Sequence, residues 1–278
     1  MEFGLSTHIF FSDRLTPEHL ERIRLAGFET TEIFCSCQHF DHHDEEQVAA
    51  IVGWLTRHHL RLNSLHSPFY VRLESGERAY LSIASADEEE RRRGIAEIAA
   101  ALRLREMIPF RYLVVHLGAT GQRHQRDSAK QARRSLCELI DRAGAQGVTI
   151  AVENIPNTLS TSDQLAQLAD EFEEIRFCLD TGHAHIEGDV ASVARRLGDR
   201  IVTTHIHDNF GREDEHLPPY EGSIPWTELL DALVRIPYPG AYMFEVRGGV
   251  HLERNLTATI AARSRFTQVI ESTRRGDD

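Results

Sequence analysis

Apolar residues along the chain follow two alternating periodicities. Eight short runs rich in Val, Ile, Leu and Phe have the pattern of strands, and a stretch with helical spacing follows each one. The strand-like runs cover residues 2–8, 28–35, 60–66, 111–117, 148–154, 175–180, 201–207 and 241–247. This strict alternation predicts a parallel sheet covered by helices. Eight repeats fit a closed (β/α)8 TIM barrel better than an open sheet.

The ends of several helices are also marked in the sequence. Thr16 and Pro17 are typical of an N-cap and a first helical position, and a C-terminal helix is predicted from about Leu252 to Thr273. The glycine fingerprint of a dinucleotide fold does not follow the first strand. No linker-like segment divides the chain, so we predict one domain over residues 1–278. Residues 67–85 and 208–225 are expected to be loops on the catalytic face.

Most of the predicted strands end in a side chain that can bind a metal. These residues are His66, His116, Glu153, Asp180, His205, His207 and Glu245, and His183, Asp214 and His216 lie just beyond. Alternate strand residues point into a barrel, and active sites form at the carboxyl ends of the strands. On this rule Leu62, Ser64 and His66 share an inward face, as do Cys178 and Asp180.

Each of these residues also has a simpler explanation when it is taken alone. A single His on an apolar strand is more often a hydrogen-bonded core residue than a ligand. Independent accidents would not place such residues at the inward end of so many strands. Buried carboxylates are costly, whereas one shared divalent cation would satisfy several together. The pattern therefore predicts a metal site.

Composition and charge narrow the range of partners. The 278 residues carry a formal net charge of -12, which disfavours nucleic acid because such binding relies on clustered Lys and Arg. No apolar run approaches the roughly 20 residues of a membrane-spanning helix. The start, MEFGLSTHIFF, lacks the pattern of a signal peptide. Four cysteines without a CxxC pair favour a reduced, cytoplasmic protein.

Other polar groups are less informative. We interpret QHFDHHDEE, with His39, His42 and His43, as a polar loop before a helix capped by Asp44. Glu32 either contacts substrate or pairs with its neighbours. Arg247 either binds an anionic substrate group or forms an ion pair. The chain has neither a GxSxG elbow nor a P-loop.

The chain resembles the xylose isomerase-like TIM-barrel superfamily, which includes sugar isomerases, ketose epimerases and endonuclease IV. The resemblance covers essentially the whole chain. The most specific segments are VENIPN, CLDTGHAHIEGD, HIHDN and DEHLPPYEGSIPW, and the last is typical of the sugar phosphate isomerase/epimerase-like branch.

The epimerase branch implies one divalent metal (Zn, Mn or Mg) at Glu153, Asp180, His205 and Glu245. In that branch Glu153 and Glu245 would also move a proton on a carbon next to a carbonyl, and the metal would stabilise the enediolate. His183 and Arg247 would hold substrate oxygens, and Glu32 is a further candidate for substrate binding.

Endonuclease IV implies a different use of the same residues, with up to three Zn ions. His66 and His116 with Glu153 would hold the first ion, and the four epimerase ligands would hold the second. His183, Asp214 and His216 would hold the third. His207 matches no ligand of either family and is set aside.

Three functions remain in competition. The sequence favours a cytoplasmic metal-dependent isomerase or epimerase that acts on a small carbohydrate. The alternative is a multinuclear zinc phosphoester hydrolase similar to an abasic-site endonuclease. A binding module without catalysis is the third, and the intact Glu153/Glu245 pair argues against it.

Overall fold

The computed structural model describes residues 1–72, 76–123 and 126–276. Eight strands form one parallel sheet in the order β10-β1-β2-β3-β6-β7-β8-β9. Their bounds are β1 Phe3–Ser6, β2 Thr30–Phe34, β3 Arg61–His66, β6 Tyr112–Val115, β7 Thr149–Glu153, β8 Arg176–Asp180, β9 Ile201–His205 and β10 Tyr242–Phe244. The predicted (β/α)8 TIM barrel is therefore confirmed.

Backbone hydrogen bonds just beyond β9 close the sheet into a barrel. The Ile206 amide donates to the Met243 carbonyl at 2.7 Å, and the Glu245 amide donates to the Ile206 carbonyl at 3.0 Å. Because these bonds join the two edges of the sheet, the carboxyl ends of all eight strands meet around one opening.

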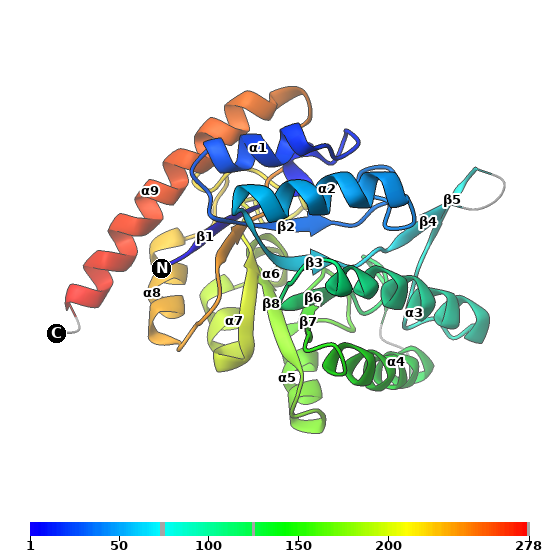
Figure 1. Ribbon diagram of the computed structural model, residues 1–278. Coiled ribbons are helices and arrows are strands. Elements are labelled where there is room, and N and C mark those ends of the chain that lie inside the picture. The colour runs from blue at the N-terminus through cyan, green and yellow to red at the C-terminus, as the bar shows by residue number, and fades with distance from the viewer. Residues whose placement is uncertain (73–75, 124–125, 277–278) are drawn as a thin grey trace.

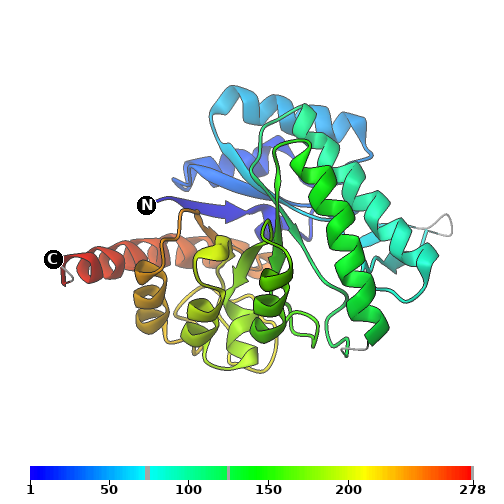
Figure 2. The ribbon, with the colours of Figure 1, turned by 90° about the horizontal axis from the view of Figure 1, so that it is seen from below.

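Helices surround the barrel in Figures 1 and 2. They are α1 Pro17–Leu25, α2 Glu45–His58, α3 Glu88–Leu102, α4 Arg126–Gly144, α5 Ser162–Glu171, α6 Thr181–Glu187, α7 Val190–Leu197, α8 Trp226–Arg235 and α9 Leu252–Gly276. Pro17 begins α1 and Leu252 begins α9, as the sequence predicts. The short helix α6, directly after β8, is an addition to the predicted elements. Among the described residues no helix is long and apolar enough to cross a membrane.

The main core lies between the strands and the helices. Outward-facing strand residues such as Leu5, Ile33 and Leu113 pack in one buried cluster with helix residues such as Leu20, Leu136 and Phe266. A smaller cluster, made of Val114, Ala151, Cys178 and Val202 with Tyr112 against it, is separate from the main core. Apolar packing thus supports the barrel, and its carboxyl end is left to polar side chains.

A register shift between β2 and β3 modifies the predicted alternation of faces. Thr31 pairs with Leu62 and Glu32 with Ser64, so Asn63 is an extra residue in β3. Asn63 Nδ2 reaches Thr203 Oγ1 at 3.4 Å, while Leu62 belongs to the main core. The predicted common face of Leu62, Ser64 and His66 is therefore wrong at Leu62, because the bulge breaks the two-residue repeat.

The segment predicted as a loop over residues 67–85 contains a short hairpin. Its strands are β4 Tyr70–Arg72 and β5 Arg78–Tyr80, which pair antiparallel. The part at 73–75 lies outside the described residues. Figure 1 shows the hairpin projecting from the barrel on the side of α3. Tyr80 anchors its base by donating a hydrogen bond from Oη to the Gly118 carbonyl at 2.7 Å.

His39 is a core residue and not part of a polar loop surface. Its side chain is fully buried, and its Nδ1 lies 2.7 Å from the Asp13 carbonyl oxygen. The His39 carbonyl accepts hydrogen bonds from the Leu15 amide and from Gln47 Nε2, both at 2.8 Å. Burial lowers the pKa of His39 to about 4. Asp44 caps α2 as predicted, because its Oδ1 accepts from the Gln47 amide at 2.9 Å.

Because of this burial, we expect the free energy of unfolding to depend on pH. His39→Gln should make that dependence weaker. The unfolded histidine takes up a proton near pH 6.5, whereas folded His39 stays neutral down to about pH 4. Its contribution is therefore present above pH 6.5 and lost as the pH falls toward 4, by up to about 1.4 kcal/mol per pH unit. Urea unfolding between pH 4 and 7 should show a shallower acid loss in His39→Gln than in the parent.

The exposed His251 provides the matched control for this experiment. His251→Gln should follow the parent at every pH, because this side chain is exposed to solvent in the folded chain as it is in the unfolded chain. The same acid slope in His39→Gln and in the parent would contradict this interpretation of His39.

Candidate metal centre

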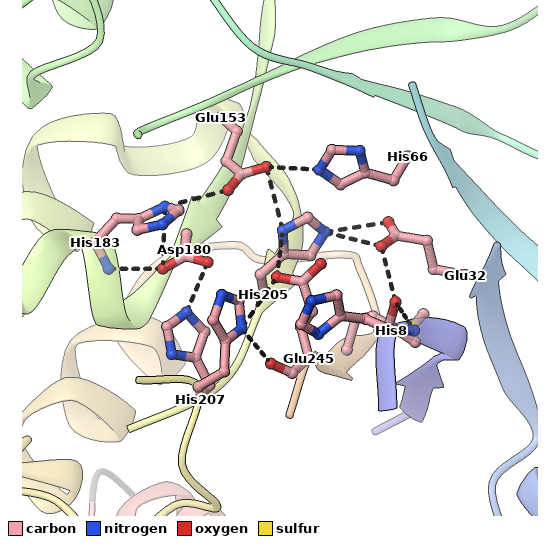
Figure 3. A network of polar contacts seen from close by, with 12 residues as sticks. His8, Glu32, His66, Glu153, Asp180, His183, His205, His207 and Glu245 are labelled. Carbon is pink, nitrogen blue, oxygen red and sulfur yellow. Dashed lines mark hydrogen bonds and ion pairs between the residues drawn. The ribbon is translucent and has the colours of Figure 1, made fainter. Parts of the chain in front are cut away.

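Glu153 is the residue on which most of the site converges. Its carboxylate, at the end of β7, is 1% exposed. Oε2 lies 3.0 Å from His116 Nε2, 3.5 Å from His66 Nε2 and 3.3 Å from His205 Nδ1. Oε1 lies 3.2 Å from His183 Nδ1. Figure 3 shows Glu153 beside His66, His183 and His205. Side chains from three other strand ends and α6 thus meet at one carboxylate.

Asp180 organises a second group at the end of β8. Its Oδ1 caps α6 by accepting from the His183 amide at 2.7 Å, which turns the His183 ring toward Glu153. His183 Nδ1 lies 3.4 Å from Asp180 Oδ1, and His207 Nε2 lies 3.0 Å from Asp180 Oδ2. His183 therefore connects Asp180 to Glu153.

His207 belongs to this second group, although the sequence interpretation set it aside. Its side chain is fully buried, and hydrogen bonds between its backbone and Thr181 Oγ1 hold it in place. The available signal was the alternation of the predicted strand 201–207, which puts residue 207 on the same face as His205. His207 was set aside only because it matches no metal ligand of either family.

A third group comes from the loop after β9. Asp214 Oδ2 lies 3.3 Å from His183 Nε2 and 3.1 Å from His216 Nε2. The His216 Nδ1 is 2.8 Å from the Glu245 backbone oxygen, which ties the loop to the end of β10. Glu245 Oε2 lies 3.5 Å from His205 Nδ1. All nine predicted metal-ligand residues therefore belong to one connected network.

A buried aspartate gives the loop that carries Asp214 and His216 its shape. Asp208 accepts hydrogen bonds from the Tyr220 amide at 2.9 Å, the Ile224 amide at 3.1 Å and Trp226 Nε1 at 2.8 Å. Its backbone also pairs with Leu217 in both directions. Because Asp208 fastens both the far side of the loop and α8, Asp214 and His216 are directed back over the barrel.

The donor set fits a divalent cation. His, Asp and Glu are ligands of zinc and of harder divalent ions, and ligand atoms about 2.1 Å from a tetrahedral ion lie about 3.4 Å apart. The contacts around Glu153 Oε2 have this spacing. Several triads lie close enough to share an ion: His66/His116/Glu153, His66/His205/Glu245, and Asp180/His183/His207. His207 Nδ1 and Glu245 Oε1 are buried without a hydrogen-bond partner.

Two pKa values in the network are raised, one by burial and the other by a neighbouring charge. Burial raises the pKa of the Glu245 carboxyl to about 7, and the charges of His205 and His216 oppose this rise only partly. Burial disfavours protonation of His216, but the charge and hydrogen bond of Asp214 outweigh it and raise the pKa of His216 to about 9. A bound cation would balance the negative charge of the buried carboxylates, as protonated imidazoles do in its absence. Its binding would therefore release protons.

Glu32 lies beneath the network and not in the cavity above it. Its fully buried carboxylate is 3.0 Å from His205 Nε2 and accepts hydrogen bonds from Ser64 Oγ at 2.7 Å and Ser6 Oγ at 3.3 Å. This position favours orientation of the His205 ring over contact with a substrate. Glu32 thus pairs with its neighbours, and its contact with a substrate stays a prediction.

A cavity of about 500 Å³ opens above the network. Glu153, Glu245, His183 and Arg247 are among its lining residues, and its aromatic wall consists of Phe11, Phe34, Phe69, Tyr70 and Tyr80. Arg247 lies at the exposed rim, where its backbone amide donates to the His216 carbonyl at 3.0 Å. The volume suits a small molecule.

The chain belongs to the xylose isomerase-like TIM barrel family, whose model matches residues 20–266. Among curated relatives, an uncharacterised protein of Methanocaldococcus jannaschii is 26% identical over 88% of this chain and 83% of its own length. The D-psicose 3-epimerase of Enterocloster bolteae is 24% identical over 87% of this chain and 80% of its own length.

Solved structures share the fold over nearly the whole chain. A D-tagatose 3-epimerase-like protein has a TM-score of 0.81 at 23% identity, with 98% of this chain and 99% of that chain covered. The IOLI protein, in a structure with a bound zinc atom, has a TM-score of 0.76 at 18% identity, with 98% and 99% covered. At these identities the likeness establishes the fold.

Gly182 provides a test of whether His207 belongs to the metal centre. A Cβ at this position would overlap the His207 imidazole and lie 2.8 Å from Asn209 Nδ2. Gly182→Ala should therefore push His207 away from Asp180 and weaken zinc binding at least about tenfold. Competition with a chromophoric chelator measures the affinity.

Gly144→Ala is the matched control, because a Cβ there meets no atom within 4 Å and lies at the end of α4. It should leave zinc affinity unchanged. Parental affinity in Gly182→Ala would exclude His207 from the centre.

Proposed function

We propose that this protein is a divalent-metal-dependent sugar isomerase or epimerase with Glu153 and Glu245 as its acid/base pair. The observation that carries the proposal is the placement of the two carboxylates. They stand at the ends of β7 and β10, 3.3 and 3.5 Å from the same His205 nitrogen, and both line the cavity. The relationship to a D-psicose 3-epimerase supports the same class of substrate.

The chemistry required is removal and return of a proton on a carbon next to a carbonyl. Two carboxylates from separate strands can address opposite faces of a substrate held between them, so one removes the proton and the other returns it. A divalent cation held by Glu153, Asp180, His205 and Glu245 would supply Lewis-acid polarisation of the carbonyl. Asp180 reaches this set through His183, and His207 is a further candidate ligand on its side.

The remaining cavity residues suit a small carbohydrate. His183 exposes its ring to the cavity between Glu153 and Asp214 and can hold a substrate hydroxyl. Arg247 can reach an oxygen or an anionic group from the rim. The aromatic wall can pack against the apolar C–H faces of a sugar while the opposite wall hydrogen-bonds its hydroxyls.

Glu245→Gln tests the acid/base assignment. The amide keeps the size of the side chain but cannot carry the proton, so we expect at least about a hundredfold loss of exchange. The measurement is solvent-deuterium incorporation, followed by NMR, across a panel of ketoses and sugar acids. Glu253→Gln, which changes a Glu that is 81% exposed on α9, should retain parental exchange. Retained exchange in Glu245→Gln would remove Glu245 from this role.

The second candidate is a multinuclear zinc phosphoester hydrolase. The specific observation in its favour is that both outer triads are assembled, His66/His116/Glu153 and His183/Asp214/His216. Against it, Arg78 and Arg247 are the two Arg or Lys residues among those described as lining the cavity. A duplex with its phosphates requires many more cationic contacts.

Metal content in Asp214→Asn separates the two candidates. A hydrolase with three ions should lose one equivalent of zinc, because Asp214 would be a ligand of the third ion. The epimerase should keep the single ion of its barrel and its proton exchange. Elemental analysis after removal of free metal gives the count, and Asp231→Asn on the outer helix α8 is the control. Loss of one zinc by Asp214→Asn would favour the hydrolase.

A further inference from the structure

Two histidines of the loop between β2 and α2 converge on one carboxylate outside the barrel. His43 Nε2 lies 2.8 Å and His42 Nε2 lies 3.3 Å from the same oxygen, Glu97 Oε2. The two ring centroids are 4.1 Å apart. Glu97 belongs to α3, so the contact joins two elements that are separate in sequence.

The His42 side chain is directed into this cluster from a buried position. It is 6% exposed, and its Nε2 has no hydrogen-bond partner of good geometry. His43 is 51% exposed, which leaves the cluster open to water on one side. A turn over residues 42 and 43 brings the neighbouring rings to the same side of the chain.

Adjacent structure fixes the loop in this arrangement. The Asp41 carboxylate accepts from the His43 amide at 3.0 Å, and the Asp41 amide donates to Gln47 Oε1 at 3.0 Å. Asp44 caps α2 and pairs with Arg14. The two imidazoles are therefore held by the backbone, and little ordering remains for a ligand to impose.

We propose that His42, His43 and Glu97 form a second, peripheral zinc site, separate from the centre in the barrel. Two imidazoles and one carboxylate within 4.8 Å of one another match the three-residue donor set that zinc accepts, with water as the fourth ligand. Nitrogen donors favour zinc over magnesium or calcium. None of the three residues lines the central cavity.

A metal at this position would tie the loop after β2 to α3. The same loop carries Gln38, whose Oε1 accepts a hydrogen bond from Arg78 Nη1 at 3.1 Å in the hairpin strand β5. The peripheral ion would thus stabilise the loop after β2, and through Gln38 it would stabilise the hairpin that lines the cavity. Its role is structural, because it lies outside the reacting groups.

Zinc titration of the metal-free full-length chain against a chromophoric chelator tests the proposal. The parent should bind one more equivalent than His43→Gln or Glu97→Gln. His251→Gln, which changes an exposed histidine outside the described metal-ligand clusters, should bind as many equivalents as the parent. Urea unfolding without metal should give similar midpoints for His43→Gln and the parent, since His43 is half exposed.

A variant of the central site makes the two centres distinguishable. Asp180→Asn should weaken zinc binding in the barrel and retain the equivalent that His43→Gln removes. Equal stoichiometry and affinity in the parent, His43→Gln and Glu97→Gln would overturn the peripheral site. The proposal would also be overturned if the additional zinc equivalent bound only after the chelator was saturated.

Discussion

The burial of the Glu153 carboxylate is the constraint on which the carboxyl end of the barrel depends. A carboxylate that is 1% exposed is costly unless opposite charge and hydrogen-bond donors surround it. The compensation comes from His66, His116, His183 and His205, which stand on or beyond four other secondary-structure elements. The sheet must close, and α6 must begin directly after its N-cap Asp180, before these imidazoles can meet one carboxylate.

The polar network has two layers, one on each side of the His205 ring. His205 separates Glu32, which is bound by two serines below it, from Glu153 and Glu245 above it. With one nitrogen engaged by Glu32, the other nitrogen is directed at the cavity side, which is the usual way in which an outer carboxylate orients a ligand imidazole. The bulge at Asn63 contributes to this arrangement by advancing Ser64 to the position where it donates to Glu32.

Much of this architecture follows from periodicity, and the exceptions have identifiable causes. Alternating strands and helices are local properties, so the sequence predicts the barrel, its eight strands and the meeting of strand-end residues. Bulges depend on pairing between strands, and a one-residue slip at Asn63 moves Leu62 off the inner face. The positions of Asp214 and His216 depend on the buried Asp208, whose partners lie up to 18 residues away. The burial of His39 does not follow from the local pattern, because it arises from contacts with Asp13 and Gln47.

The cavity wall distinguishes between functions that share the same ligands. His66 packs against Phe34 with ring centroids 4.7 Å apart, and His116 stacks on Phe69 at 5.4 Å. These two histidines therefore extend the aromatic wall as well as facing Glu153. An enzyme for duplex DNA needs a wide cationic surface at the same place. The cavity of about 500 Å³, with Arg78 and Arg247 among its lining residues, has the size of a small-molecule site.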